Sequence, residues 1–354
     1  MDDRSFVAAQ DFLLASKTFW TKQLFPELRR TYTDLAQRDA KTPATPEEVG
    51  ILLQNNILYQ YFSWLERHLQ RLKYSGRYGL MPYHDERREN LSLKLVDTGA
   101  ELRSELKMPA YYQRVDIHQH PGGVWADELS GFVYERGARS TTPLMGTNHA
   151  DLHQRFTDFV KEQGNKKIFL DILDMGCGFG KSTHPFSQEY PSARIEAIDL
   201  SAPCLGLGAN DARNRGEHNI NFRQMNACET DYEDASFDFV TSTMLIHEMP
   251  PAEIGRLFDE SARLLKPGGR MAHLDFYAID SSFSRFIHYG HGRRNNEPFM
   301  QPLAELDMVE VLRNRGFTNI EIIPFKEAEG INPSDHQAWR FPWTVIQADK
   351  PVVD

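Results

Sequence analysis

The sequence lacks the features that mark secreted and membrane proteins. Its cysteines are few and unclustered, and they form no C-x-x-C pair: Cys177, Cys204 and Cys228. Such a set favours reduced thiols. No apolar run approaches the length of a membrane span. The first residues show no basic region followed by an apolar core. We therefore expect a cytoplasmic protein with no membrane partner.

An excess of basic charge is also lacking. The 354 residues include 40 Lys and Arg against 50 Asp and Glu, which gives a net charge of −10. Residues 1–150 are balanced, with 19 of each sign, so the whole excess of acid lies in the remainder. An acidic surface is a poor match for a phosphate backbone. We therefore expect no nucleic-acid partner and a small-molecule substrate.

The most informative part of the sequence is a glycine-rich stretch at positions 168–183. It reads I-F-L-D-I-L-D-M-G-C-G-F-G-K-S-T. Its first seven residues are mostly apolar and predict a buried parallel strand over 168–174. Three glycines follow at alternate positions: Gly176, Gly178 and Gly180. Glycine allows a sharp turn and the close approach of a ligand, and the helix predicted after it offers free backbone N–H groups. This order is typical of a nucleotide-type binding site.

Three nucleotide-binding motifs compete for this stretch. A phosphate-binding loop, G-x-x-x-x-G-K-[ST], requires a glycine where Met175 stands. A dinucleotide fingerprint, G-x-G-x-x-G, requires a glycine where Lys181 stands. The third motif, D-x-G-x-G-x-G, is complete, with Asp174 ahead of the three glycines. It resembles motif I of the class I S-adenosylmethionine-dependent methyltransferases.

Further motifs follow in the order that this family shows. The next predicted strand carries Asp199, which lies 19 residues after Gly180. This is the separation expected for a carboxylate that holds a ribose diol. The strand predicted over 237–243 resembles the family's F-D-x-V strand, and L-K-P-G-G-R at 265–270 resembles the turn that precedes its next strand. Together these motifs are far more specific than the glycines alone.

The resemblance, which covers residues 150–350, implies a fold and a cofactor. The fold is α/β, with a doubly wound, mostly parallel sheet of seven strands. The cofactor is S-adenosylmethionine, which leaves as S-adenosylhomocysteine. Asp174 and the glycine loop would hold its methionine end, and Asn226 stands where the family often has an acid that meets the adenine. The cofactor-binding residues that we predict are Asp174, Gly176, Cys177, Gly178, Gly180, Asp199, Leu200, Asn226, Ala227 and Thr243.

Residues 1–147 predict a mainly helical domain, because apolar residues recur there with helical spacing. A Thr-Pro-Glu-Glu start predicts one helix over 46–74, and residues 86–107 predict another. We expect this domain to cap residues 148–354, the Rossmann-like domain, or to form a homodimer. An insert at about 275–305, rich in aromatic and basic residues, predicts a lid over the substrate.

Residues 111–125, which read Y-Y-Q-R-V-D-I-H-Q-H-P-G-G-V-W, differ in character from the helices before them. In a strand, His118 and His120 would share one face. We predict that one of Tyr112, His118 and His120 faces the substrate, and the alternative is a polar strand and turn that lines a pocket. We expect no metal site, because no carboxylate or cysteine completes a ligand set at a known spacing.

The predicted reaction transfers a methyl group in line from the sulfonium of the cofactor to a small-molecule acceptor. Alignment and desolvation are then the main tasks, and a base is needed only if the acceptor must lose a proton. His247 is the predicted base or acceptor-orienting group, since imidazole titrates near neutrality. A structural histidine beside Glu248 is the alternative. The alternative functions are a related fold that binds the cofactor without methyl transfer, and an NAD-type oxidoreductase.

Overall fold

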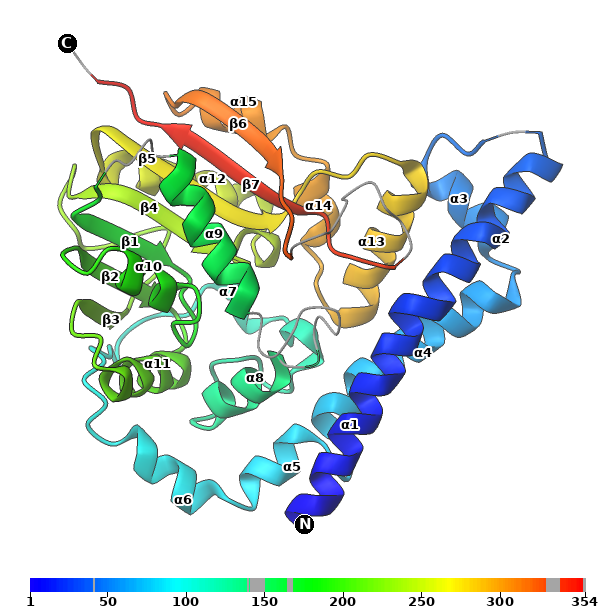
Figure 1. The fold of residues 1–354 in the computed structure, drawn as a ribbon, viewed down its shortest axis with the longest axis horizontal. Helices are drawn as coiled ribbons and strands as arrows, with labels where there is room; N and C mark the ends of the chain where they lie inside the picture. Colours follow the sequence, from blue (N-terminus) through cyan, green and yellow to red (C-terminus); the bar gives the residue numbers. More distant parts are fainter. Residues whose placement is uncertain (41, 139, 141–149, 164–167, 329–337, 353–354) are drawn as a thin grey trace.

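A sheet of seven strands forms the centre of the molecule. The computed structural model describes residues 1–352 apart from 41, 139, 141–149, 164–167 and 329–337. The strands lie in the order β3-β2-β1-β4-β5-β7-β6 (Figure 1). They are β1 (Asp171–Met175), β2 (Arg194–Asp199), β3 (Ile220–Gln224), β4 (Phe237–Thr243), β5 (Leu265–Phe276), β6 (Thr318–Pro324) and β7 (Trp343–Asp349).

Strands β1 to β5 pair in parallel, whereas β7 runs antiparallel to both β5 and β6. The predicted fold class, a doubly wound and mostly parallel sheet beside a helical N-terminal region, is therefore confirmed. The turn predicted at 265–270 lies within the first part of β5. Leu265 pairs with Phe237 and Arg270 with Phe239, the register shifts between these pairs, and Gly268 has a φ of +74°.

Two layers of helices cover the sheet. The helices in this half of the chain are α9 (Ala150–Gln163), α10 (Thr183–Glu189), α11 (Ala202–Arg215), α12 (Pro251–Leu264), α13 (Ser282–Asn295), α14 (Met300–Ala304) and α15 (Met308–Arg313), with a short 3₁₀ turn, η5 (Ile246–Glu248). Side chains alternate across a strand. Ile172 therefore packs with α9 and α10 on one face, while its neighbour Leu173 packs with α12 and α15 on the other.

The N-terminal half is mainly helical. Its elements are α1 (Asp3–Phe19), a π-helical turn η1 (Trp20–Leu24), α2 (Phe25–Arg38), α3 (Pro46–Leu53), α4 (Ile57–Ser75), α5 (Leu80–Asp85), α6 (Arg88–Ser92), η2 (Leu93–Leu95), α7 (Ala110–Gln113), η3 (Ile117–Gln119) and α8 (Ser130–Ala138). The single helix predicted over 46–74 is two helices. Asn56 divides them, because its side-chain oxygen accepts hydrogen bonds from the N–H groups of Leu58 and Tyr59 and so begins α4.

Two further predictions for this half are wrong. The helix predicted over 86–107 ends by Leu95, because Asp97 and Gly99 take left-handed backbone angles and Glu101 then forms a bridge to the edge of β3. The strand considered for 111–125 is absent, because His118 and Gln119 also have positive φ, +58° and +57°. Such angles interrupt an extended chain.

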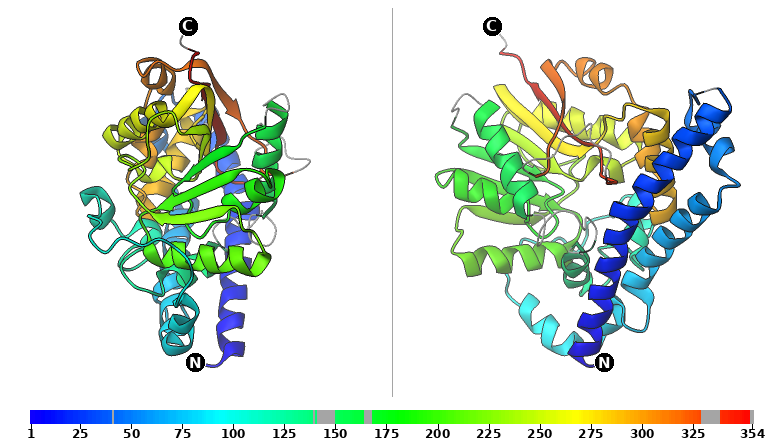
Figure 2. Two further views of the ribbon diagram at one scale, coloured as in Figure 1. Left: turned by 90° about the vertical axis from the view of Figure 1, so that its left-hand side faces the viewer. Right: turned by 45° about the vertical axis from the view of Figure 1, so that its right-hand side comes forward.

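The N-terminal helices pack against the predicted lid. Helix α13 contacts both α3 and α4 and lies between them and the sheet (Figures 1 and 2). Trp20 stacks on Phe62, and it also meets Trp339 edge-on at 5.2 Å between ring centroids. One apolar core therefore joins residues of both halves. The predicted domain boundary at 147/148 lies outside the described residues.

Candidate active site

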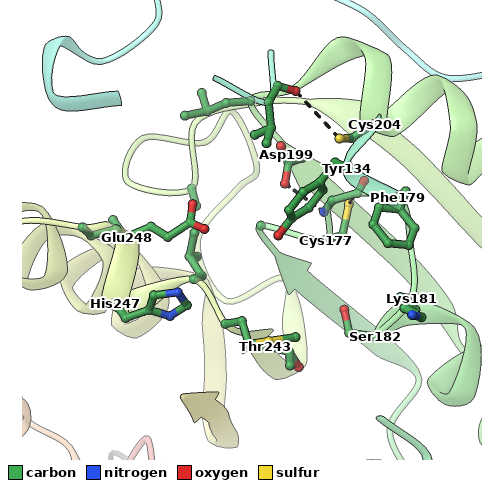
Figure 3. Close-up of a pocket in the computed structure, with 18 of the residues that line it drawn as sticks. Tyr134, Cys177, Phe179, Lys181, Ser182, Asp199, Cys204, Thr243, His247 and Glu248 are labelled. Atoms are coloured by element: carbon green, nitrogen blue, oxygen red, sulfur yellow. Dashed lines mark hydrogen bonds between the residues drawn. The ribbon is translucent and has the colours of Figure 1, made fainter. Parts of the chain in front are cut away.

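One pocket opens at the carboxyl ends of the parallel strands, where ligands bind in open α/β sheets. It is lined by the glycine loop after β1, the end of β2, the turn after β3, the end of β4 and η5. The N-terminal half closes it with residues of α7, η3 and α8. In Figure 3, His247 and Glu248 face Tyr134 and Phe179 across this pocket. Both halves of the chain therefore build the site.

The glycine loop brings backbone to the pocket wall. Gly176 has a φ of +69°, and a Cβ there would lie 2.7 Å from Leu245. A Cβ at Gly178 would meet nothing within 4 Å, and this residue lines the pocket together with Gly176 and Cys177. Gly180 packs instead against Phe222, where a Cβ would lie 2.8 Å from the ring. Three of the predicted loop residues thus face the pocket, and Gly180 does not line it.

Asp174 lies beneath the loop and does not line the pocket. Its side chain is fully buried, and one carboxylate oxygen accepts hydrogen bonds from the hydroxyls of Ser182 (2.8 Å) and Thr183 (2.6 Å). Burial raises the pKa of Asp174 to about 6, against the smaller opposing effect of these hydroxyls. Asp174 therefore ties the start of α10 to the end of β1, a role that the motif alone does not reveal.

Asp199 lies at the end of β2 on the pocket wall, as Figure 3 shows. Its carboxylate accepts hydrogen bonds from the N–H groups of Gly178 (2.8 Å) and Ser201 (2.7 Å), which fix its orientation. Burial raises its pKa to about 6, although these backbone donors favour the charged form. Each carboxylate oxygen can accept a further hydrogen bond, so the side chain has capacity for a diol.

The remaining predicted cofactor residues also line the pocket. Leu200 follows Asp199, Asn226 and Ala227 form the turn after β3, and Thr243 ends β4. The side-chain oxygen of Asn226 accepts a hydrogen bond from the N–H of Cys228 at 3.0 Å. This bond holds the turn and leaves the oxygen one further lone pair. The structure thus gathers eight of the ten predicted cofactor residues on one wall.

His247, predicted as the base or acceptor-orienting group, lies on the opposite wall and is buried. Its Nδ1 is 2.7 Å from a carboxylate oxygen of Asp275, which is fully buried near the end of β5. The other oxygen of Asp275 accepts a hydrogen bond from the N–H of Ile246, 2.7 Å away. Burial lowers the pKa of His247, but the Asp275 carboxylate outweighs burial and the pKa is raised. The Nε2 atom is left for the pocket.

His118 reaches the pocket from the N-terminal half. Its Nε2 lies 3.0 Å from Glu248, and its Nδ1 lies 3.0 Å from Glu297. Burial lowers the pKa of His118, but the two carboxylates raise it to about 9. Tyr134 stacks parallel to the imidazole at 6.1 Å, and Tyr112 lines the same part of the pocket. His118 and the two tyrosines, all from the N-terminal half, therefore lie in the part of the pocket that also holds Glu248 and Glu297.

His120, the third candidate from this segment, does not line the pocket. Its ring stacks on Tyr74 at 5.0 Å, and neither ring nitrogen has a hydrogen-bond partner among the described residues. Burial lowers its pKa to about 3, which keeps it neutral. The side chain packs in the cap as an apolar ring, and the turn at Gln119 separates it from His118.

Sequence reasoning missed three groups of the site: Tyr134, Asp275 and Glu297. Asp275 had a usable signal, since it stands at the carboxyl end of a predicted parallel strand, where ligands bind. Tyr134 and Glu297 had none, because both reach the pocket from helical segments whose packing only the tertiary structure reveals. The predicted lid residues Arg293 and Arg294 do not line the pocket. Arg294 pairs instead with Glu66 of α4.

Comparison with known proteins agrees with this geometry. Residues 172–269 match the family model described as a methyltransferase domain. By sequence, this segment belongs to the methyltransferase domain family. The match confirms the resemblance seen in the sequence for this half, and the cofactor of the family is S-adenosylmethionine. The N-terminal half has no family match.

Two curated relatives are similar to part of this chain. A probable methyltransferase, ltbC of Aspergillus luteorubrus, is 33% identical over 161 residues, which cover 41% of this chain and 56% of the relative. The ubiquinone/menaquinone biosynthesis C-methyltransferase UbiE of Hahella chejuensis is 29% identical over 127 residues, which cover 35% of this chain and 50% of that protein. The chain thus spans about half the length of these relatives.

Solved structures show a weaker likeness. Phosphoethanolamine N-methyltransferase 2 of Haemonchus contortus, solved with S-adenosylmethionine, has a TM-score of 0.48 and 19% identity, covering 69% of this chain and 60% of that one. The [4+2]-cyclase SpnF has a TM-score of 0.43 and 21% identity, covering 56% and 81%.

Proposed function

We propose that the protein is a methyltransferase that transfers the methyl group of S-adenosylmethionine to a small-molecule acceptor. The observation that carries this proposal is the pocket itself. One wall gathers the glycine loop and Asp199, the other presents His247 and Glu248, and helical segments of the N-terminal half close it. A bound cofactor and an acceptor would be held against each other and away from water, as in-line transfer requires.

The cofactor would lie along the first wall. Backbone groups of Gly176 to Gly178 support its methionine end, Asp199 accepts hydrogen bonds from its ribose, and Asn226 with Ala227 meets its adenine. Asp174 acts indirectly, by holding the loop through Ser182 and Thr183. The carboxylate of Asp199 makes charge-assisted hydrogen bonds, which are stronger than neutral ones.

The acceptor would lie between the sulfonium and His247. Asp275 accepts the Nδ1 hydrogen of the imidazole, so the lone pair at Nε2 is the group that His247 presents to the acceptor. A buried imidazole with one fixed tautomer orients an acceptor well, because its direction is set by the second hydrogen bond. Tyr112 and Tyr134 supply the remaining wall.

Residues 1–147 act, in this proposal, as a cap on the active site and as the contact surface of a homodimer in the cytoplasm. The outer faces of α1 and α4 support the second role, since Phe12, Ile57 and Trp64 are 64%, 77% and 54% exposed. No helix among the described residues is long and apolar enough to cross a membrane. Light scattering of the purified protein measures the oligomeric state, and a monomer at micromolar concentration contradicts the dimer.

Calorimetric titration tests the proposed function directly. We expect S-adenosylmethionine and S-adenosylhomocysteine to bind with a stoichiometry of one and NAD not to bind. Binding of NAD alone contradicts the proposal. Incubation of the protein with methyl-labelled cofactor and a fractionated metabolite extract then identifies the acceptor. Cofactor binding with no labelled product in any fraction favours a related fold that does not transfer methyl.

A further inference from the structure

Three potential metal ligands converge in the acceptor half of the pocket. One ligand atom each of His118, His247 and Glu248 lies within 4.8 Å of the other two. We propose that these residues bind a divalent transition metal, which holds an oxygen atom of the acceptor. The set arises from η3 and η5, two turns that are distant in the sequence and brought together only by the cap. Two histidines and a carboxylate form a known open metal site with free positions.

The distances suit a metal of ordinary radius. The Nε2 of His118 lies 3.0 Å from the nearer oxygen of Glu248. Two ligands at right angles, each about 2.1 Å from a metal, stand about 3 Å apart. The imidazoles of His118 and His247 are 6.4 Å apart between centroids, tilted by 48°, so both rings can direct a nitrogen at one point. Ligands on opposite sides of a metal stand about 4.2 Å apart, so a gap as wide as 4.8 Å must close by between about 0.6 Å and about 1.8 Å, depending on the angle at the metal.

Each of the two imidazoles has a buried carboxylate behind it. Asp275 lies 2.7 Å from Nδ1 of His247, and Glu297 lies 3.0 Å from Nδ1 of His118. Both carboxylates are buried. This is the arrangement that fixes the tautomer of a metal-binding histidine, because the second nitrogen donates its hydrogen and the first keeps its lone pair.

The backbone at His118 is held in a costly conformation. His118 and Gln119 are consecutive non-glycine residues with left-handed φ, a conformation that persists only where the surrounding structure holds it. Hydrogen bonds from two side-chain amides hold this turn in place. Gln70 donates to the carbonyl of His118 at 2.8 Å, and Gln119 donates to the carbonyl of Arg294 at 2.6 Å. The surrounding structure therefore aims this imidazole at Glu248.

The charge balance of the pocket favours a dication. Three acids surround the two imidazoles: Asp275 and Glu297 are buried, and Glu248 is partly exposed. The Nε2 of His118 faces Glu248, and its Nδ1 faces Glu297. A divalent cation bound between Nε2 and Glu248 would offset part of this negative charge while Nδ1 stays directed at Glu297. Imidazole and carboxylate ligands together suit iron, zinc and related ions better than magnesium.

The open positions of such a metal would face the pocket, where Tyr112 and Tyr134 form the wall. A ligand that completes the coordination must carry an oxygen donor, such as an enol, a phenol or a carboxylate. We therefore infer an oxygen-bearing acceptor, and this part of the inference rests on the proposed function. The metal would fix the acceptor oxygen and so set which atom meets the methyl group.

Metal titration tests the site without any acceptor. The full-length protein is stripped with a chelator, dialysed and titrated calorimetrically with Zn²⁺ and with Co²⁺, whose visible absorption reports its ligands. We expect one ion per chain. His118→Ala and Glu248→Gln should each weaken binding at least about 100-fold, and Glu297→Gln about 10-fold, the usual effect of losing a partner of a ligating histidine. Glu248→Gln keeps the shape of the side chain, so it remains informative if His118→Ala fails to fold.

A surface histidine provides the matched control. His218 is exposed and lies outside the pocket, and His218→Ala should bind the metal as the wild type does. No stoichiometric binding of either ion overturns the inference. Binding that survives in Glu248→Gln, or that is lost in His218→Ala, also overturns it, because the ion is then adventitious.

The acceptor part has its own readout. Once labelled transfer to an acceptor is found, the stripped protein should transfer methyl at less than about one tenth of the original rate, and added metal should restore the rate. Binding of S-adenosylmethionine should not change on stripping. Full transfer by the stripped protein overturns the role of the metal, whereas loss of cofactor binding by the untreated protein contradicts the proposed function itself.

Discussion

The two walls of the pocket are built in different ways. The cofactor wall comes from one continuous part of the chain, residues 176–243, and uses mostly backbone groups and small side chains at strand ends. The acceptor wall comes from four separate segments, which carry Tyr112, His118, His247 and Glu297, and it uses long polar side chains. The first wall is a property of the sheet, whereas the second exists only when the cap is in place.

This difference indicates how the two tasks are divided. A cofactor shared by a whole family can be held by backbone geometry, which tolerates changes of side chain elsewhere. In the proposed function an acceptor is recognised by particular side chains; Tyr112 and His118 come from the half that has no family match, whereas His247 comes from the matched segment. Substitutions on the two walls should therefore separate cofactor binding from turnover.

The largest effect is expected from Gly176→Val. The residue has a φ of +69°, and its Cβ would overlap Leu245 at 2.7 Å, so the loop must move. We expect cofactor affinity to fall about 1,000-fold, given the combined cost of strain and overlap. The matched control is Gly216→Ala, which has a similar φ of +72° with open space around it. Near-normal binding by the valine variant would show that the loop does not hold the cofactor.

His247→Ala should distinguish most clearly between turnover, which depends on the acceptor wall, and cofactor affinity, which depends on the cofactor wall. We expect turnover to fall about 100-fold, in the range for a positioned acid–base group, while cofactor affinity stays within about threefold. Single-turnover rates with labelled cofactor, together with calorimetry, measure both quantities. Equal losses in the two measurements would mean that His247 supports the fold of the whole pocket and has no special part in the acceptor half.

Asp199→Ala should affect only the cofactor wall, and therefore cofactor affinity. Loss of even one hydrogen bond to a charged group, worth about 1.5–3 kcal/mol, predicts at least about a tenfold loss of cofactor affinity. Asp280→Ala, at an exposed position, is the control. Turnover at saturating cofactor should change little. If affinity is unchanged, the ribose is held elsewhere.

Asp174→Asn should have the smallest effect on affinity, within about threefold, because the residue does not line the pocket. Its effect should be on stability. Burial raises the pKa of Asp174 to about 6 in the folded state, above the unfolded value of about 3.9, so wild-type stability falls as pH rises through about 6.

Asparagine carries no charge and can still accept hydrogen bonds from Ser182 and Thr183. The gain in melting temperature of the variant over the wild type should therefore be larger at pH 8 than at pH 5. The exposed variant Asp280→Asn should show no such dependence. A difference that does not change with pH would mean that Asp174 titrates normally in the folded protein.

The sequence predicted the sheet well and the cap poorly, for a physical reason. The signals for β4 and α11 are local, since apolar runs, caps and glycine turns lie within a few residues of one another. The break before α4 also had a local signal, the Asn56 cap. The turn at His118 instead depends on contacts with distant residues, such as the hydrogen bond from Gln70. The joint position of His118 and Glu248, which are 130 residues apart in the chain, likewise follows only from tertiary packing.

The shared aromatic core has a consequence for protein engineering. Trp20 and Phe62 of the cap pack with Trp339, and the cap also rests on α13. The helical half therefore cannot be exchanged for that of another protein as an independent module, because its partners lie inside the half that carries the sheet. A chimaera with a new acceptor range would have to carry residues 1–147, α13 and the segment around Trp339 as one graft.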